Sequence, residues 1–428
     1  MCPSPLFISE DLIAEVLSVL NVKSILRFRC VNKHWDTLIS DPTFVKLHLK
    51  QSAKRNPHVI LKSDHTKSIP GESPYGSDDE SECARGIIPH SISSLIENPS
   101  FTVYVDSFYI VEDKGCSSMV GSCNGLICLA GFTTTREYLE DWFRLWNPAT
   151  RTTSPKFGFL RLFYNRPDFT SSYANDGYYK FTFGCDDSTG TYKVVASRHN
   201  DRELRSNVRI LSFGDSVWRE IESFPVDPLC LRSCCDNGVS FKSTLNWLAV
   251  HNTIFYIGDD YKDITIDQFS IVSLDLRSET YNQYLVPHEF DEVPPNAPII
   301  GVLGDCLFFS SRYKETDIII WQMKKFGVQD SWTQFLKISC HSLQIDYDYS
   351  EYMKYHFKLV PLFLSKDGDT LILYCILEHP TILYNWRNNS VVRTNITARK
   401  IITDDETSNC ISCSANVYFE SLVSVFGV

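Results

Sequence analysis

A unit of four strand-like segments recurs along most of this chain, and it restricts the possible folds more than any other feature. The unit occurs five times after residue 86, and its third segments centre on Leu145, Ile210, Ser273, Ile320 and Tyr384. Successive units therefore lie roughly 45 to 65 residues apart, a spacing that suits propeller blades with inserted loops. Turns at 188–190, 303–305 and 366–368 contain a glycine, which tolerates the positive φ of tight hairpins.

Two further strand-like stretches, 101–110 and 417–425, belong to none of these units. Paired in one sheet, they would form a further blade and hide two sheet edges that otherwise promote aggregation. The sequence therefore predicts a large all-β domain over residues 86–428, an irregular β-propeller of about six blades. Because large aromatic side chains dominate packing between blades, six tryptophans are predicted to lie in the core: Trp146, Trp218, Trp247, Trp321, Trp332 and Trp386.

Residues 9–49 instead carry apolar side chains at helical spacing, which predicts a small all-α module, a helical bundle. Ser9 is placed to cap the first helix, and Asp41-Pro42 to start the last one. A segment of about 40 residues cannot hide so many apolar side chains in one small core. Either the β-domain or a partner covers the surplus, and the pattern alone leaves both possibilities open.

The segment between the two parts lacks apolar periodicity. From about residue 62 it contains Pro70-Gly71, Pro74 and Gly76, followed by an acidic run at 78–82. Such a composition is typical of a flexible connection. Residues 51–85 are therefore predicted to be a flexible acidic linker.

Charge and cysteine content exclude several classes of protein. The net charge of −11 opposes binding to nucleic acid or to an anionic membrane, because both need clustered Lys and Arg. No apolar run reaches the roughly 18 residues of a membrane helix, and no secretory signal pattern is present. An intracellular location, in the cytoplasm or the nucleus, is expected. The 15 cysteines are mostly scattered singly, and the pair Cys410 and Cys413 lacks further ligands, so no disulfide scaffold, metal or cofactor is expected.

Residues 8–49 resemble the F-box of plant F-box proteins, through ISEDLIAEVLSVLNVKSILRFRCVNKHWDTLISDPTFVKLHL. The family usually opens with Leu-Pro, continues through Pro-Val-Lys-Ser-Leu and Arg-Phe-Arg-Cys-Val, and ends in a Trp and Asp-Pro-x-Phe. This chain departs from it at Ser9 and Asn21, where Pro is usual, and at Asn32, where many relatives have Cys. The resemblance implies an F-box over residues 1–50 that binds a Skp-type adaptor, with Trp35 mainly in its own core. Seven residues are implied to form the adaptor-binding face: Leu12, Ile13, Val16, Leu20, Val22, Leu26 and Val31.

Residues 86–428 resemble the F-box-associated interaction domain of the plant F-box/kelch-like family. The resemblance is carried, in order, by Gly121-Ser-Cys-Asn-Gly-Leu126, Trp146-Asn-Pro-Ala-Thr-Arg151, Leu245-Asn-Trp-Leu248 and Ser273-Leu-Asp-Leu276. Both resemblances together imply the substrate-recognition subunit of an SCF-type cullin–RING ubiquitin ligase. The adaptor would join it to the cullin and RING subunits, and the β-domain would bind a protein or glycoprotein target. The alternative is a propeller-type module that binds protein or glycan without a ligase role.

Catalytic motifs are missing from the sequence. The segment most similar to a sialidase Asp-box, Ser365-Lys-Asp367-Gly368-Asp-Thr370, lacks the spacer before Gly and the final Trp, and it fits a hairpin turn. No GxSxG, HExxH or GxxxxGK[ST] pattern occurs. A propeller by itself does not imply chemistry, so the chain is expected to be a non-catalytic receptor.

Binding residues of a propeller are expected on its loops, because the core occupies the strands. Four insertions stand out, at 163–179, 228–237, 287–298 and 346–355. The first and last are rich in Tyr, and Tyr and Arg are enriched at protein interfaces. The predicted target-binding residues are Phe163, Tyr164, Arg166, Phe169, Tyr173, Tyr347, Tyr349 and Tyr352.

Overall fold

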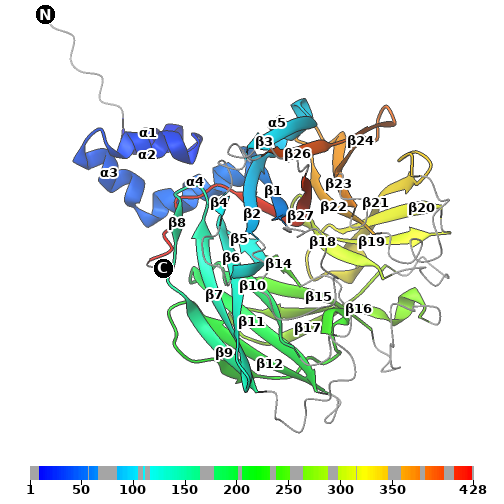
Figure 1. Ribbon diagram of the computed structural model, residues 1–428. Helices are drawn as coiled ribbons and strands as arrows, with labels where there is room; N and C mark the ends of the chain where they lie inside the picture. Colours follow the sequence, from blue (N-terminus) through cyan, green and yellow to red (C-terminus); the bar gives the residue numbers. More distant parts are fainter. Residues whose placement is uncertain are drawn as a thin grey trace, which may run out of the picture.

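The computed structural model shows a six-bladed β-propeller with a module of four helices on one side (Figure 1). It describes residues 9–55, 57–65, 84–104, 109–110, 116–163, 178–200, 205–231, 238–250, 264–287, 297–314, 316–345, 358–375, 381–399 and 409–426. The predicted fold class is confirmed. Within these ranges, no helix combines the length and the apolar character needed to cross a membrane.

The helical module consists of α1 (Glu10–Ser18), α2 (Val22–Arg29), α3 (Lys33–Ser40) and α4 (Pro42–Arg55). Ser9, Asn21 and Asn32 cap the first three helices, each accepting a hydrogen bond from the backbone N–H three residues ahead. These are the three positions at which the sequence departs from the usual F-box pattern, so each departure supplies a side chain that stabilises a helix start. Asp41 and Pro42 begin α4, as predicted.

Five blades follow one another along the chain, and each coincides with one predicted unit. All five place the predicted third segment on the third strand. Blade 1 contains β5 (Cys116–Cys123), β6 (Leu126–Thr134), β7 (Tyr138–Asn147), β8 (Thr152–Thr153) and β9 (Phe157–Phe163), where β8 and β9 both pair with β7. Blade 2 contains β10 (Lys180–Asp186), β11 (Thr191–Asn200), β12 (Arg205–Ser212) and β13 (Arg219–Ile221).

Blade 3 contains β14 (Val239–Phe241), β15 (Thr244–Val250), β16 (Phe269–Asp275) and β17 (Tyr281–Leu285). Blade 4 contains β18 (Ile299–Leu303), β19 (Cys306–Tyr313), β20 (Asp317–Met323) and β21 (Trp332–Ser339). Blade 5 contains β22 (Leu359–Leu364), β23 (Thr370–Cys375), β24 (Thr381–Asn385) and β25 (Ser390–Arg393). Short 3-10 helices lie at Leu229–Leu231, Ile266–Gln268 and Gln329–Ser331.

Blade 6 closes the ring with strands from both ends of the described chain. Its order is β3 (Ser100–Tyr104), β26 (Asn395–Arg399), β27 (Asn409–Phe419), β1 (Pro57–His65), β2 (Ala84–Ser91) and β4 (Tyr109–Ile110), and the short helix α5 (Ile92–Glu97) follows β2. First strands of neighbouring blades lie side by side, and β27 contacts both β22 and β5. The two ends therefore complete one blade, as expected.

Two predictions are wrong in detail: the pairing of the closing strand and the length of the linker. The closing strand ends at Phe419 and pairs directly with β1 and β26, whereas the predicted partner stretch 101–110 contributes to the edge strands β3 and β4 of the same sheet. The predicted linker 51–85 is also too long, because residues 51–55 belong to α4 and Pro57–His65 is a propeller strand. β1 pairs with β2 on one side and with β27, more than 300 residues away, on the other, and neither partner adjoins it in the sequence, so local periodicity did not reveal the strand. The remainder of the predicted linker, 66–83, lies outside the described residues.

The same turn ends the third strand in blades 1, 3 and 5. The side chains of Asn147, Asp275 and Asn385 each accept hydrogen bonds from the backbone N–H groups two and three residues ahead. The residue four positions ahead adopts positive φ in every case: Arg151, Glu279 and Asn389. Such side-chain-to-backbone bonds mimic a backbone turn and fix the hairpin that leads into the outer strand.

Tryptophan side chains pack in the core, and two of them form hydrogen bonds between neighbouring blades. Trp146, Trp247 and Trp321 are buried, as predicted. Trp218 and Trp332 are half-buried, and each donates its indole N–H to a carbonyl of the preceding blade, at 3.0 Å to Gly158 O and 3.0 Å to Leu285 O. Trp386 is 38% exposed and donates to Gly368 O within its own blade, so its predicted place in the core is wrong.

A cluster of ion pairs connects blades 2 and 3. The Glu279 carboxylate lies 2.8 Å from Lys193 Nζ and accepts two hydrogen bonds from Arg219, at 2.7 and 2.9 Å. Lys193 is buried and also donates to Leu276 O. The Arg219 hydrogen bonds, with help from Lys193, hold the pKa of Glu279 below its usual value. Glu279 is thus the shared partner of two cations from the adjoining blade.

Candidate interaction surfaces

The helical module exposes large apolar side chains to solvent. Among the residues predicted to bind the adaptor, Leu12, Val16 and Val31 are 51%, 58% and 61% exposed. Leu12 and Val16 lie one turn apart on the same face of α1. The Glu10 carboxylate lies 3.7 Å from His34 Nε2, which brings the first turn of α1 close to the α2–α3 connection that contains Val31. These three residues are called the exposed helical face below.

The other four predicted adaptor residues are less accessible. Ile13, Leu20 and Leu26 are half-buried, and the first two pack against the helical core of Leu17, Ile25, Ile39 and Phe44. Val22 is fully buried at the start of α2, so it does not belong to the accessible face. Trp35 packs on Phe28 with ring centroids 5.0 Å apart, consistent with its assignment mainly to the module's own core.

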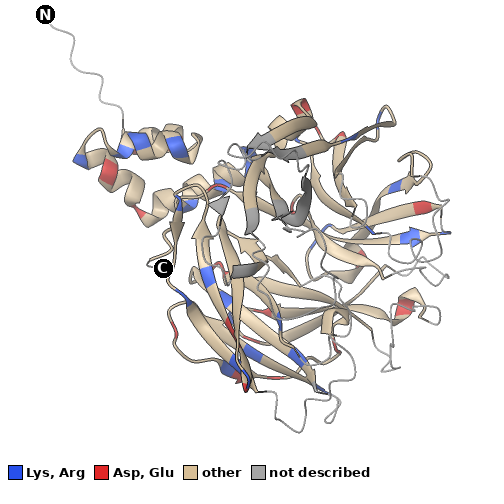
Figure 2. Ribbon diagram, in the orientation of Figure 1, with Lys and Arg blue, Asp and Glu red and all other residues tan. Residues whose placement is uncertain are grey.

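The helical module is basic although the whole chain is acidic. Residues 9–55 contain eight Lys and Arg against five Asp and Glu, while the complete sequence carries a net charge of −11. Figure 2 shows several of these cations along the helices. An exposed apolar face within a basic module suits an acidic protein partner that also has apolar side chains to bury.

One of the predicted target-binding residues lies in the described part of the chain. Phe163 is the last residue of β9 and is 39% exposed. The remaining seven lie outside the described residues: Tyr164, Arg166, Phe169, Tyr173, Tyr347, Tyr349 and Tyr352. Most of the four predicted loops lies outside as well, so their role in target contact stays a prediction.

An aromatic and cationic cluster surrounds Phe163 on the outer part of blade 1. Phe159, Arg161 and Phe163 alternate along β9 with buried Leu160 and Leu162, so the three share the exposed face. Arg161 lies 2.6 Å from Glu140 and 4.7 Å from the ring centroid of Tyr138, and the Tyr138 ring packs edge-on against Phe163. Sequence reasoning missed this cluster because β9 was not predicted as a strand.

A buried carboxyl group lies behind this cluster. Asp141 pairs with Leu160 in the β7–β9 ladder and has little contact with solvent. Burial raises the pKa of Asp141 to about 7, because a charged carboxylate loses its hydration there. No sequence pattern predicts the burial of Asp141, since an aspartate on an exposed strand is ordinary.

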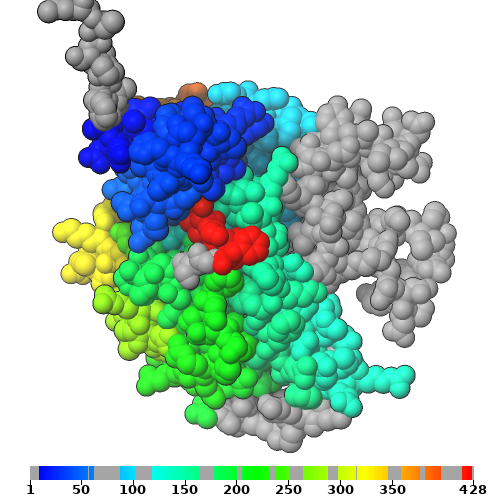
Figure 3. All heavy atoms as spheres, turned by 90° about the vertical axis from the view of Figure 1, so that its left-hand side faces the viewer, coloured from blue at the N-terminus to red at the C-terminus, as the bar shows by residue number. Residues whose placement is uncertain are grey.

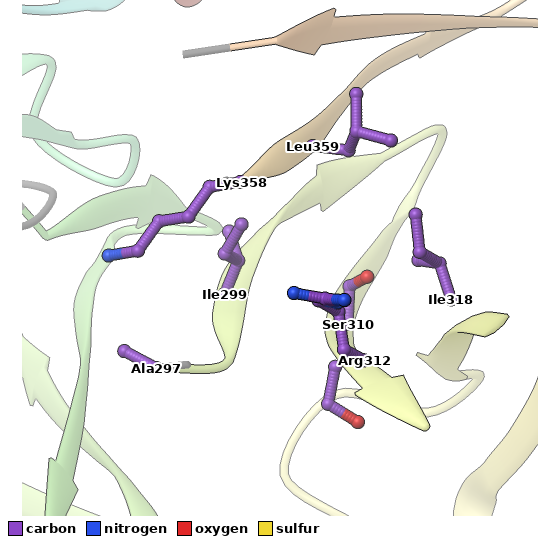
Figure 4. Close-up of a pocket in the computed structure, with 8 residues that line it drawn as sticks. Ala297, Ile299, Ser310, Arg312, Ile318, Lys358 and Leu359 are labelled. Atoms are coloured by element: carbon purple, nitrogen blue, oxygen red, sulfur yellow. The ribbon is translucent and has the colours of Figure 1, made fainter. Parts of the chain in front are cut away.

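A small cavity lies between blades 4 and 5. Its lining includes Ser310, Arg312, Ile299 and Lys358 (Figure 4). Its volume is about 20 Å³. A space of that size holds about one water molecule, far less than a typical ligand site. In the ranges described above, no group of three or more His, Cys, Asp or Glu side chains is arranged to bind a metal ion.

Comparison with known proteins supports the sequence resemblance. Residues 88–415 match the family model described as an F-box associated beta propeller domain. An F-box/kelch-repeat protein of Arabidopsis thaliana is 26% identical over 349 residues, covering 78% of this chain and 80% of the relative. The F-box protein CPR1 of the same plant is 24% identical over 396 residues, covering 86% and 79%.

Proposed function

This chain belongs to the plant F-box proteins that carry an associated β-propeller domain, and from that premise we propose that it is a substrate receptor of an SCF-type ubiquitin ligase. In this role the helical module binds a Skp-type adaptor, and the adaptor connects it to the cullin and RING subunits. The propeller binds the protein that is to be ubiquitinated. We also propose that the protein acts in the cytoplasm or the nucleus, because the role requires access to those subunits.

The exposed helical face is the observation that supports this proposal most directly. Three large apolar side chains protrude from a module of about 40 residues, and the propeller leaves them uncovered. Burying each against a partner would contribute about 1 to 2 kcal/mol, because roughly half of each side chain still faces water. The basic charge of the module adds attraction toward an acidic adaptor.

In the proposed role the protein forms or breaks no bond. It raises the effective concentration of a target beside a ubiquitin-conjugating enzyme that the ligase holds. No substitution of a single polar residue in the propeller should then behave as a catalytic knockout. The alternative, a protein- or glycan-binding propeller without a ligase role, differs in one respect: it needs no adaptor.

Co-purification with a Skp-type adaptor separates the two roles. The double variant Leu12→Asp, Val16→Asp should weaken adaptor binding by at least about 100-fold, since two apolar contacts are lost and two carboxylates must be desolvated. Both side chains are exposed, so the helices should keep their fold. A double change of Leu20 and Leu26 to Asp should also abolish binding, but Leu20 packs on the helical core.

A matched control uses exposed valines of the propeller. Val217→Asp, Val392→Asp introduces the same charges at exposed positions and should leave adaptor binding unchanged. Circular dichroism would verify equal helical content in all variants. Adaptor binding that survives in the Leu12 and Val16 double variant, at equal helical content, would exclude the proposed docking face and favour the alternative.

A further inference from the structure

The segment after the closing strand runs between the helical module and the propeller. Once β27 ends at Phe419, residues 420–426 continue without regular secondary structure, and they are called the strap here. Figure 3 shows it in red, between the blue helices above and the green strands of the propeller below. A segment remote in sequence from the helical module is thus part of its surroundings.

Two strap residues contact the helical module. The Glu420 carboxylate accepts a hydrogen bond from the backbone N–H of Val22, at 3.3 Å. Val22 is the first residue of α2, where the N–H groups have no partner within the helix and where negative charge is favourable. Leu422 packs against the helical core around Leu17 and Ile25.

The residues that alternate with these contact blade 1. Asn147 at the end of β7 donates its amide N–H groups to the carbonyls of Ser421 and Val423, at 3.0 and 2.9 Å. Val425 is buried in the core between blades 1 and 2. Ser421 lies so close to Gly125 that a Cβ added there would approach its side chain to 2.2 Å.

This alternation makes the strap a second connection between the two parts of the chain. The first is covalent, since α4 ends at Arg55 and β1 begins at Pro57. A single covalent connection leaves the angle between the two parts free, whereas two separated connections define that angle. Lys366 of blade 5 adds a hydrogen bond to Arg55 O, at 2.9 Å. Any rotation of the helical module away from blade 1 must break either the contacts of Glu420 and Leu422 or those of Ser421 and Val423.

We propose that the strap fixes the orientation of the helical module relative to the propeller, with Glu420 and Leu422 as positioning residues for ubiquitin transfer. This inference rests on the proposed function, because a receptor must present its bound target at a defined place beside the conjugating enzyme. Effective concentration at a reacting group depends steeply on such geometry. The strap leaves the exposed helical face uncovered, so it acts on geometry and not on adaptor affinity.

The test measures the distance between the two parts directly. Spin labels attached through unnatural amino acids at Lys33 in α3 and Asp305 in blade 4, both exposed, report the interdomain distance by double electron–electron resonance in the full chain. The wild type should give one narrow distance distribution. The double variant Glu420→Gln, Leu422→Ala should widen it at least twofold, and Glu420→Gln alone should widen it less. Phe426→Ala, which changes an exposed strap residue, should leave it narrow.

A second measurement ties orientation to function. In a reconstituted ligase, mass spectrometry would map the lysines of the receptor that become self-ubiquitinated. The wild type should modify a restricted set, and the double variant should spread modification over more lysines while binding the adaptor as tightly as before. A distribution as narrow as that of the wild type in both strap variants would overturn the strap proposal. Loss of adaptor binding in the Leu12 and Val16 variant tests the proposed function separately.

Discussion

Replacing Asn147 with alanine removes the side chain that joins the turn of blade 1 to the strap. Asn147 is fully buried, and its amide oxygen accepts hydrogen bonds from Ala149 N and Thr150 N, at 3.0 and 3.3 Å. Its amide nitrogen donates to Ser421 O and Val423 O. Alanine can make none of these four bonds, and the cavity it leaves lies where water has little access.

The expected cost follows from these bonds. Each buried hydrogen bond contributes about 1 kcal/mol, and leaving buried partners unsatisfied adds to the loss, so Asn147→Ala should lower the free energy of unfolding by about 4 kcal/mol. Asn385→Ala is the matched control. Asn385 forms the same turn in blade 5, with bonds to Arg387 N and Asn388 N, but it is partly exposed, so water replaces the lost bonds. We expect a loss of about 1 kcal/mol there.

Urea denaturation followed by tryptophan fluorescence measures both losses. The difference between the two variants, about 3 kcal/mol, isolates the part that depends on burial and on the strap. Equal destabilisation would show that the bonds to Ser421 and Val423 contribute nothing and that the strap does not stabilise the connection between the two parts.

Three further outcomes are expected. Asp141→Asn should stabilise the protein at pH 8 by up to about 4 kcal/mol and leave its stability unchanged near pH 3.5. The reason is that the Asp141 carboxyl has a pKa of about 7 in the folded protein, so wild-type stability falls as pH rises from about 4 to 7. Denaturation measured at both pH values tests this prediction. Deletion of residues 417–428 should open the ring and make the whole propeller sensitive to limited proteolysis, while the four helices persist. A truncated propeller that resists proteolysis as well as the wild type would contradict ring closure by β27. Glu279→Ala should lower the free energy of unfolding, measured by thermal or chemical denaturation, by about 2 kcal/mol, because it leaves buried Lys193 without its carboxylate partner. Arg219→Met should lower it by less than about 1 kcal/mol, since Arg219 is largely exposed.

The sequence predicted correctly the elements that depend on residues a few positions apart. Ser9 and Asp41 mark helix starts because capping depends on residues a few positions away, and Gly190, Gly304 and Gly368 adopt the positive φ expected of their hairpins. The five central blades were found for the same reason, since each is a meander of consecutive strands.

Features that depend on distant partners were misjudged or missed. Pro57–His65 was assigned to a linker, although it is a strand between β2 and β27. Trp386 was placed in the core from residue type alone, and only the arrangement of blade 5 decides that it faces outward. Val22 follows an ordinary helical pattern, yet its burial at the strap could not be inferred from the helix sequence.

Closure of the ring also imposes an order on biosynthesis. The helices and β1 leave the ribosome early, but β27 and the hydrogen bond from Val22 to Glu420, which joins residues 398 positions apart, need almost the entire chain. At about 5 to 20 residues per second, β1 waits tens of seconds for its partner. During that interval its edge stays open to other chains and the helices lack Leu422 at their core. A nascent or prematurely ended chain therefore has its helices but lacks both the closing strand and the strap, so late chain completion is the step at which the geometry proposed for the receptor can form.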